Sequence, residues 1–325
     1  MKLLNYKILA ALAVMAMSTS ASAQAPEVDP PEPLGALRHL ERAKQIGGTD
    51  LKNIAEGYIC MPPAMANKWS GIYRSNKTPV EPFKEFDNLY YIGQIPVGLW
   101  LIKSNDGIIM LDALHDEAEA RDVVVPAMIK LGLNPADVKL IVISHSHGEH
   151  YGGAKYFYDH YKTKVVASEA DRADMIKNAD KTPIPPIDAI TDGQIFTVGD
   201  MTVQTFITPG HTLGTVSSLF SIKDKGVTKY MTMLGGTRLL LNAYDVNHGH
   251  DSVHKLWDAG RSKGAIGAVA SHLWGLDYVT LLKRPQPAKS TLDVGTAGYD
   301  RIMGIFDECT MAMTMRFLDQ RKFSF

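Results

Sequence analysis

Four side chains that can bind a metal ion lie within six residues, at His145, His147, Glu149 and His150. Neutral imidazoles and carboxylates are the ligands that zinc and similar first-row metals take in proteins. A lone histidine would indicate little, because single histidines occur in many ordinary structural surroundings. The density of this run therefore favours a metal site over a solvated surface.

The elements around the run should position these side chains. Leu140–Ile143 is a short apolar segment, which is typical of a buried strand. Alternate residues of an extended chain share a face, so His145 and His147 should point the same way as this strand ends. The loop that follows can bring Glu149 and His150 to the other side of the same pocket.

Two more histidines follow predicted strands further along the chain. His211 comes after the strand predicted at residues 202–208, and His272 comes after the strand predicted at residues 265–270. Loops at strand ends are where a rigid scaffold usually carries its chemistry. The order of a β-meander, βα units, a second meander and further helices predicts two sheets packed face to face, with helices outside.

Taken together, these motifs resemble the metallo-β-lactamase superfamily. Residues 145–153 read HSHGEHYGG, where the family has His-x-His-x-Asp-His followed by Gly-Gly. Residues 208–212 are similar to its Pro-Gly-His-Thr loop, and Ser271-His272 is similar to its last histidine. The resemblance runs from about residue 81 to residue 272 and is nearest to the third subclass of class B β-lactamases. It implies an α/β fold, the αβ/βα four-layer sandwich of two mixed sheets.

The resemblance also implies ligands for two zinc ions. The first ion would be held by His145, His147 and His211, and the second by Glu149, His150 and His272. Glu149 departs from the family's aspartate, and its extra methylene moves the carboxylate by about 1.5 Å. Zinc–oxygen bonds tolerate only small errors, so we expect the second site to be weaker or shifted. Asp112 resembles a family position behind the ligands, where it could orient a histidine.

The activity implied is hydrolysis of the β-lactam ring of a small-molecule antibiotic. Zinc lowers the pKa of bound water to about 7, and the resulting hydroxide can attack the amide carbonyl. Glu149 would serve as a ligand and as a catalytic residue that orients the water. Thr237 is a candidate for holding a second water, and Trp274 for lining the substrate cleft.

Two other functions stay open. One is a zinc hydrolase of another small lactone, ester or amide. Relatives that cleave lactones or glutathione thioesters generally bridge both metals with an aspartate, and Gly235-Gly236 supplies none in the corresponding stretch. This favours the lactamase-like branch. The other is a metal-binding protein in which the change to Glu149 has abolished turnover.

A second group of histidines follows at His248, His250 and His254. His250 and His254 have the i, i+4 spacing of one helix face. No strand positions them, however, and Gly249 makes the segment flexible. A structural role, or a role at the rim of the pocket, is the stronger interpretation from sequence.

The N-terminal segment predicts export. Residues 1–23 combine Lys2 and Lys7, a short apolar stretch and an Ala-Ser-Ala cleavage pattern, which together resemble a secretory signal peptide. This predicts a periplasmic or secreted protein, with an uncleaved anchor as the alternative. We expect residues 24–80 to be a leader and extension, and residues 81–325 to be the hydrolase domain.

Composition and cysteine content limit the partners. The 325 residues have a formal net charge of −1, so no basic field indicates nucleic acid. Neither a membrane partner nor an oligomeric state is indicated. Cys60 and Cys309 could form a disulfide in an oxidising compartment, or they could be two independent buried thiols.

Overall fold

The computed structural model describes residues 31–74, 76–238, 243–273, 290 and 292–321. The predicted signal peptide, residues 1–23, lies outside these ranges. Within them, no helix combines the length and the apolar character that crossing a bilayer requires.

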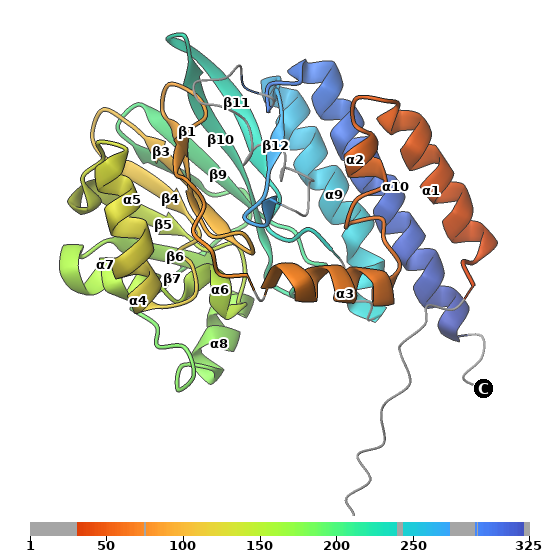
Figure 1. Ribbon diagram of the computed structural model, residues 1–325, viewed down its shortest axis with the longest axis horizontal. Coiled ribbons are helices and arrows are strands. Elements are labelled where there is room, and N and C mark those ends of the chain that lie inside the picture. Colours follow the sequence, from red (N-terminus) through yellow and green to blue (C-terminus); the bar gives the residue numbers. More distant parts are fainter. Residues whose placement is uncertain (1–30, 75, 239–242, 274–289, 291, 322–325) are drawn as a thin grey trace, which may run out of the picture.

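Two β-sheets form the centre of the molecule (Figure 1). The first sheet contains β1 (Phe83–Lys84), β2 (Leu89–Gly93), β3 (Gly98–Lys103), β4 (Ile108–Leu111), β5 (Val138–Val142), β6 (Lys164–Ser168) and β7 (Asp188–Ile190). The second contains β8 (Ile195–Val198), β9 (Met201–Ile207), β10 (Val216–Asp224), β11 (Val227–Met233) and β12 (Ala268–Val269). Pairing is antiparallel from β1 to β4 and parallel from β4 to β7. In the second sheet only β12 pairs in parallel, so both sheets are mixed.

The two sheets pack face to face because each carries apolar residues on both sides. In β3, Trp100 and Ile102 enter the core between the sheets, whereas Leu99 and Leu101 face the helices. Successive side chains of a strand point to opposite faces, so a continuous apolar run indicates burial on both. In β10, Phe220 likewise belongs to the core between the sheets. This four-layer arrangement confirms the predicted αβ/βα sandwich.

Helices cover the outer face of each sheet (Figure 1). The segments between β4 and β6 are α4 (Glu117–Glu119), a π-helical turn at Ala120–Val124, α5 (Val125–Lys130), a 3-10 turn at Pro135–Asp137, α6 (Gly148–Tyr151) and α7 (Ala154–Tyr161). The remaining helices are α1 (Leu34–Gly47), α2 (Lys52–Ala55), α3 (Pro63–Arg74), α8 (Glu169–Lys177), α9 (Ala243–Lys263) and α10 (Gly295–Arg321). The first sheet packs against the region from α4 to α7, and the second against α1, α2, α9 and α10.

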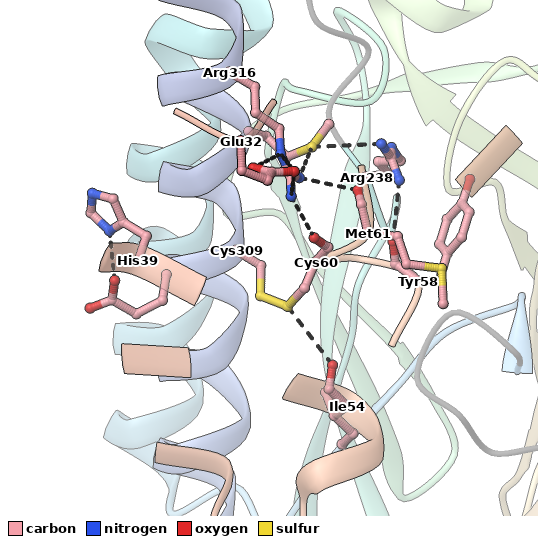
Figure 2. The surroundings of a disulfide bond; sticks show 11 residues. Glu32, His39, Ile54, Tyr58, Cys60, Met61, Arg238, Cys309 and Arg316 are labelled. Carbon is pink, nitrogen blue, oxygen red and sulfur yellow. Dashed lines mark hydrogen bonds and ion pairs between the residues drawn. A yellow bond between two sulfur atoms is a disulfide. The ribbon is translucent and has the colours of Figure 1, made fainter. Parts of the chain in front are cut away.

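A disulfide joins the N-terminal helices to α10 (Figure 2). Cys60 and Cys309 are 249 residues apart in sequence, and their Cα atoms are 4.8 Å apart. Arg316 reinforces the link by donating to the carbonyl oxygens of Cys60 at 3.0 Å and Met61 at 3.1 Å. The sequence left open either a disulfide or two independent thiols, and the structure contains the disulfide. The boundary at residue 81 stays a prediction, although α1 and α2 pack into the helical layer of the second sheet.

Candidate metal centre

The six side chains nominated from sequence lie together in two groups. Ligand atoms within each group are no more than 4.8 Å from one another. The groups are His145, His147 and His211, and Glu149, His150 and His272. They are contiguous, since the rings of His145 and His150 have centroids only 4.0 Å apart.

The loop after β5 and the short helix α6 position four of these side chains, those of His145, His147, Glu149 and His150. His147 has extended φ and ψ of −74° and 137° and precedes the single turn of α6, which carries Glu149 and His150. Two glycines let this turn approach the loop after β4. A Cβ on Gly152 would lie 1.7 Å from the carbonyl oxygen of His115, and one on Gly153 would lie 2.1 Å from that of Ala113. The Gly-Gly step is therefore a packing requirement of the centre.

The spacing between imidazole nitrogens suits a shared metal ion. His147 Nδ1 lies 3.1 Å from His145 Nε2 and 3.2 Å from His211 Nε2. In the other group, the Nε2 atoms of His150 and His272 are 3.2 Å apart. Two nitrogens bound tetrahedrally to one zinc at about 2.0–2.1 Å would be about 3.3 Å apart. The donor set and its spacing therefore fit zinc in both groups.

The second nitrogens of His211 and His272 are each held by a hydrogen bond to a backbone carbonyl. His211 Nδ1 donates to the Arg238 carbonyl at 2.7 Å, and His272 Nδ1 donates to the Pro96 carbonyl at 2.6 Å. A carbonyl oxygen can only accept, so the proton resides on Nδ1 and the lone pair on Nε2 faces the centre. Such bonds fix the tautomer and the ring orientation that a metal requires.

Asp112 fixes the tautomer and the ring orientation of His150. Its buried carboxylate accepts from His150 Nδ1 at 2.8 Å, from Ser144 N at 2.8 Å and from the Ser271 hydroxyl. The residue has a left-handed φ of 67°, which is uncommon outside glycine. Asp112 thus joins the end of β4 to the loops on either side of the centre, in the position that the resemblance implied.

Burial and mutual repulsion keep two of the histidines, His145 and His211, neutral. Burial first, and then the neighbouring His150, hold the pKa of His145 well below its usual value. Burial, followed by His147, lowers the pKa of His211 to about 3. For Glu149, burial acts to raise the pKa, but His150, its own backbone and the other histidines lower it to about 2. At neutral pH His145 and His211 are therefore neutral imidazoles and Glu149 is an ionised carboxylate, which are the forms that bind metal.

Asp171 is a positioning residue that the sequence analysis missed. Its buried carboxylate accepts from Ser146 N at 2.9 Å, from Thr212 Oγ1 at 2.7 Å and from Gly214 N at 2.9 Å. It therefore joins the loop after β5 to the loop that carries His211. The available signal was the Ser-x-x-Asp pattern that begins α8, but such a pattern predicts a helix cap and not a link between loops.

The structure describes one of the two substrate-contact candidates, Thr237. Thr237 is buried beside His211 and Arg238 in the lining of a cavity behind the centre. Trp274 lies outside the described residues. Neighbouring Gly236 has no room for a side chain, because a Cβ there would lie 2.2 Å from that of His211.

A comparison with known protein families finds a match in the central part of the chain. A family profile described as the Metallo-beta-lactamase superfamily matches residues 93–227. The match spans β5, the histidine-rich run and the loop of His211. Residues 93–227 therefore belong to a metallo-beta-lactamase superfamily domain.

Solved structures agree with this domain in their fold. The superfamily fold of BJP-1, a subclass B3 metallo-beta-lactamase of Bradyrhizobium japonicum, superposes with a TM-score of 0.60 at 23% identity, covering 76% of this chain and 95% of that one. GOB-18 of Elizabethkingia meningoseptica gives 0.59 at 19% identity, covering 76% and 94%. At such identities the likeness concerns the fold alone.

The curated sequences that are similar to part of this chain are named hydroxyacylglutathione hydrolases. The hydroxyacylglutathione hydrolase of Nitrobacter hamburgensis is 29% identical over 125 residues, which are 37% of this chain and 44% of that enzyme. That of Idiomarina loihiensis is 28% identical over 138 residues, or 42% and 45%. The chain thus spans less than half the length of these relatives.

Proposed function

We propose that the protein is a zinc-dependent hydrolase that opens the β-lactam ring of small-molecule antibiotics. The observation that carries the proposal is the pair of adjoining ligand groups, in which five imidazoles and one carboxylate converge. Zinc bound there would lower the pKa of a bound water to about 7 and polarise the substrate carbonyl. The residues fit this ion in number, chemistry and spacing.

Each group would hold one ion. His145, His147 and His211 would bind the first, with the Arg238 carbonyl and the end of β5 fixing their directions. Glu149, His150 and His272 would bind the second. Glu149 would also orient the attacking water, because its carboxylate is ionised at neutral pH and can accept a hydrogen bond from that water.

The absence of a shared carboxylate supports a lactam over a thioester. Among the residues that the structure describes, no carboxylate belongs to both ligand groups. Gly235 and Gly236 cannot be replaced by an aspartate without rearrangement, since their added Cβ atoms would lie 2.1 Å from the Val216 carbonyl and 2.2 Å from the His211 Cβ. The bridging ligand typical of glutathione-thioester hydrolases therefore has no place in this loop.

A second candidate is hydrolysis of a small ester or thioester such as a hydroxyacylglutathione. The curated relatives favour it, since their names describe this activity. The same ions could polarise a thioester carbonyl as readily as an amide carbonyl. The two functions differ in the acyl group that must fit the cleft.

We also propose that the protein acts in the periplasm or outside the cell. The signal-like residues 1–23 support this location. The Cys60–Cys309 disulfide supports it independently, because structural disulfides persist mainly in oxidising compartments.

A substrate panel tests the proposed function. The protein without residues 1–23 would be saturated with zinc and assayed against a penicillin, a cephalosporin, a carbapenem, a lactone and a hydroxyacylglutathione. We expect hydrolysis of at least one β-lactam and its loss on chelation. Turnover of the thioester alone would reject the lactamase in favour of the second candidate. Full zinc occupancy without turnover of any substrate would favour a metal-binding protein that is not a hydrolase.

A further inference from the structure

We propose that His250, His254 and Asp307 form a third metal site, which binds a divalent first-row transition-metal ion such as Zn²⁺ on the helical layer of the second sheet. These residues are not among the six side chains of the metal centre. They lie on α9 and α10, which run side by side over the second sheet (Figure 1).

The three side chains converge from two helices. His250 and His254 are one turn apart on α9, so their rings lie on the same face, with centroids 4.4 Å apart. Asp307 on α10 places Oδ1 2.6 Å from His250 Nδ1 and 3.4 Å from His254 Nε2. All three ligand atoms are within 4.8 Å of one another. An ion at normal zinc bond lengths would need ligand separations of about 3.3 Å, which small side-chain rotations supply here.

The state of His254 Nε2 points independently to a ligand. This nitrogen is shielded from solvent, and within the described part of the chain it has no hydrogen-bond partner. Polar atoms that are shielded in this way normally have a partner. The atom faces the Asp307 carboxylate, whose Oδ1 already contacts His250. A cation between these atoms would satisfy His254 without moving either helix.

The chemistry of the ligands selects the class of ion. Two imidazoles and one carboxylate suit zinc, nickel or copper, whereas magnesium and calcium prefer oxygen ligands alone. The side chains of His250, His254 and Asp307 are 45%, 41% and 19% exposed, so water can complete the coordination shell. Three ligands and an open position would give a weaker site than the buried centre.

The guanidinium of Arg42 lies close enough to Asp307 to be influenced by its charge, but it pairs with the neighbouring Glu308. The pKa of Arg42 is raised mainly by its hydrogen bond to Glu308 and less by the charge of Asp307. Its Nε lies 2.8 Å from Glu308 Oε1, so the guanidinium is directed to that neighbour. Asp307 is thus available to the two histidines.

Metal stoichiometry tests the third site. The protein without residues 1–23 would be stripped, titrated with Zn²⁺ and analysed for bound metal after removal of excess ion. We expect the double variant His250→Ala/His254→Ala to bind one equivalent fewer than the unchanged protein. Asp307→Asn, which keeps the side-chain volume, should weaken that equivalent at least tenfold. His160→Ala, at an exposed histidine on α7, is the matched control and should bind as much as the unchanged protein.

Fluorescence locates the extra ion. Trp257 has its ring centroid 5.5 Å from that of His254, so Cu²⁺ bound at the site should quench its emission. The protein loaded with two equivalents of Zn²⁺, which fill the tighter centre, should show a quenching phase that is absent in the double variant and absent after Trp257→Phe. Equal metal content and equal quenching in the unchanged protein and the double variant would overturn the proposal. Because the test reads a difference of one equivalent, its failure would leave the hydrolase proposal untouched, and failure of the hydrolase would not affect it.

Discussion

The metal centre and the helix cluster of His250, His254 and Asp307 use the same ligand chemistry with different support. In the centre, His145 and His150 are each 1% exposed, and the Nδ1 of His150 is fixed by Asp112. In the cluster, His250 Nδ1 contacts Asp307, which is itself a proposed ligand. The centre is thus held by hydrogen bonds from residues around it, while the hydrogen bonding of the cluster within the described residues joins its own members.

This difference bears on how each site should respond to change. The centre assembles ligands from the ends of both sheets, so its geometry depends on the complete fold and is rigid before any ion arrives. The cluster needs only two adjacent helices, and its exposed side chains lose rotamer freedom when an ion binds. We therefore expect tight, mutually dependent binding in the centre and weaker, independent binding in the cluster.

Removal of a central ligand should have the largest effect. His211→Ala should empty the first site and Glu149→Ala the second, and either should lower hydrolysis by about 10³-fold or more, since activation of water and positioning of charge are both lost. Zinc content and kcat/KM measure this. The double variant His250→Ala/His254→Ala should keep full kcat/KM. A zinc content in His211→Ala and Glu149→Ala equal to that of the unchanged protein would contradict the assignment of ligands.

Acid should destabilise the metal-free protein through the same histidines. The pKa of His211 is about 3 in the folded state, against 6.5 for an ordinary histidine. Between these values the unfolded chain binds a proton that the folded chain does not, so stability is complete above pH 6.5 and falls as the pH decreases toward 3. The loss from His211 alone reaches about 3 kcal/mol at pH 4.

Chemical unfolding at several pH values measures this slope. His211→Gln should remove part of it, whereas His254→Ala in the exposed cluster should leave it unchanged. A stability that is constant from pH 7 to pH 4 would mean that the central histidines are not held neutral by burial.

Loss of the disulfide should separate the helical layer from the centre. Replacing both Cys60 and Cys309 by serine should lower the free energy of unfolding by about 2–4 kcal/mol. The disulfide belongs to the helical layer of the second sheet, whereas α6 and loops at strand ends carry the six central side chains, so zinc content at 25 °C should be retained. Unfolding by denaturant and metal analysis test this, and loss of both zinc ions would show that the helical layer supports the centre more closely than we infer.

Asp112→Asn should have a smaller effect on the centre. The variant keeps the volume but removes the charge that accepts from His150 Nδ1. Changes at such supporting residues typically cost 10–100-fold in metal affinity or activity. Competition with a chelator measures the affinity of the second ion, and Asp180→Asn at an exposed position is the matched control. An affinity within twofold of the original would show that backbone geometry alone orients His150.

Residues that act through their side-chain chemistry could be predicted from the sequence, whereas those that act through a backbone carbonyl or a long-range contact could not. The six ligand candidates were visible because their side-chain chemistry and spacing after strands are properties of the sequence. The carbonyls of Pro96 and Arg238 were not, because every residue has a carbonyl and only tertiary structure selects one. Asp171 was missed because its partners lie 25 to 43 residues away in sequence.

The layers of the fold were predicted from apolar runs such as Leu140–Ile143, but the details of the helices were not. The helical segment from α4 to α5 contains a π-helical turn at Ala120–Val124, which apolar spacing does not predict. In the helix cluster, the i, i+4 spacing of His250 and His254 was visible, but Asp307 lies on a separate helix. Packing of α9 against α10 brings it into contact, and short-range sequence patterns do not report such packing.

Anomalous diffraction at the zinc edge, from crystals of the zinc-saturated protein, tests the central claim most directly. We predict two strong peaks, one within about 2.1 Å of His211 Nε2 and one within about 2.1 Å of His272 Nε2, with the remaining members of each group around them. The absence of a zinc peak from either group, or His211 and His272 turned away from the histidines of residues 145–150, would contradict the account.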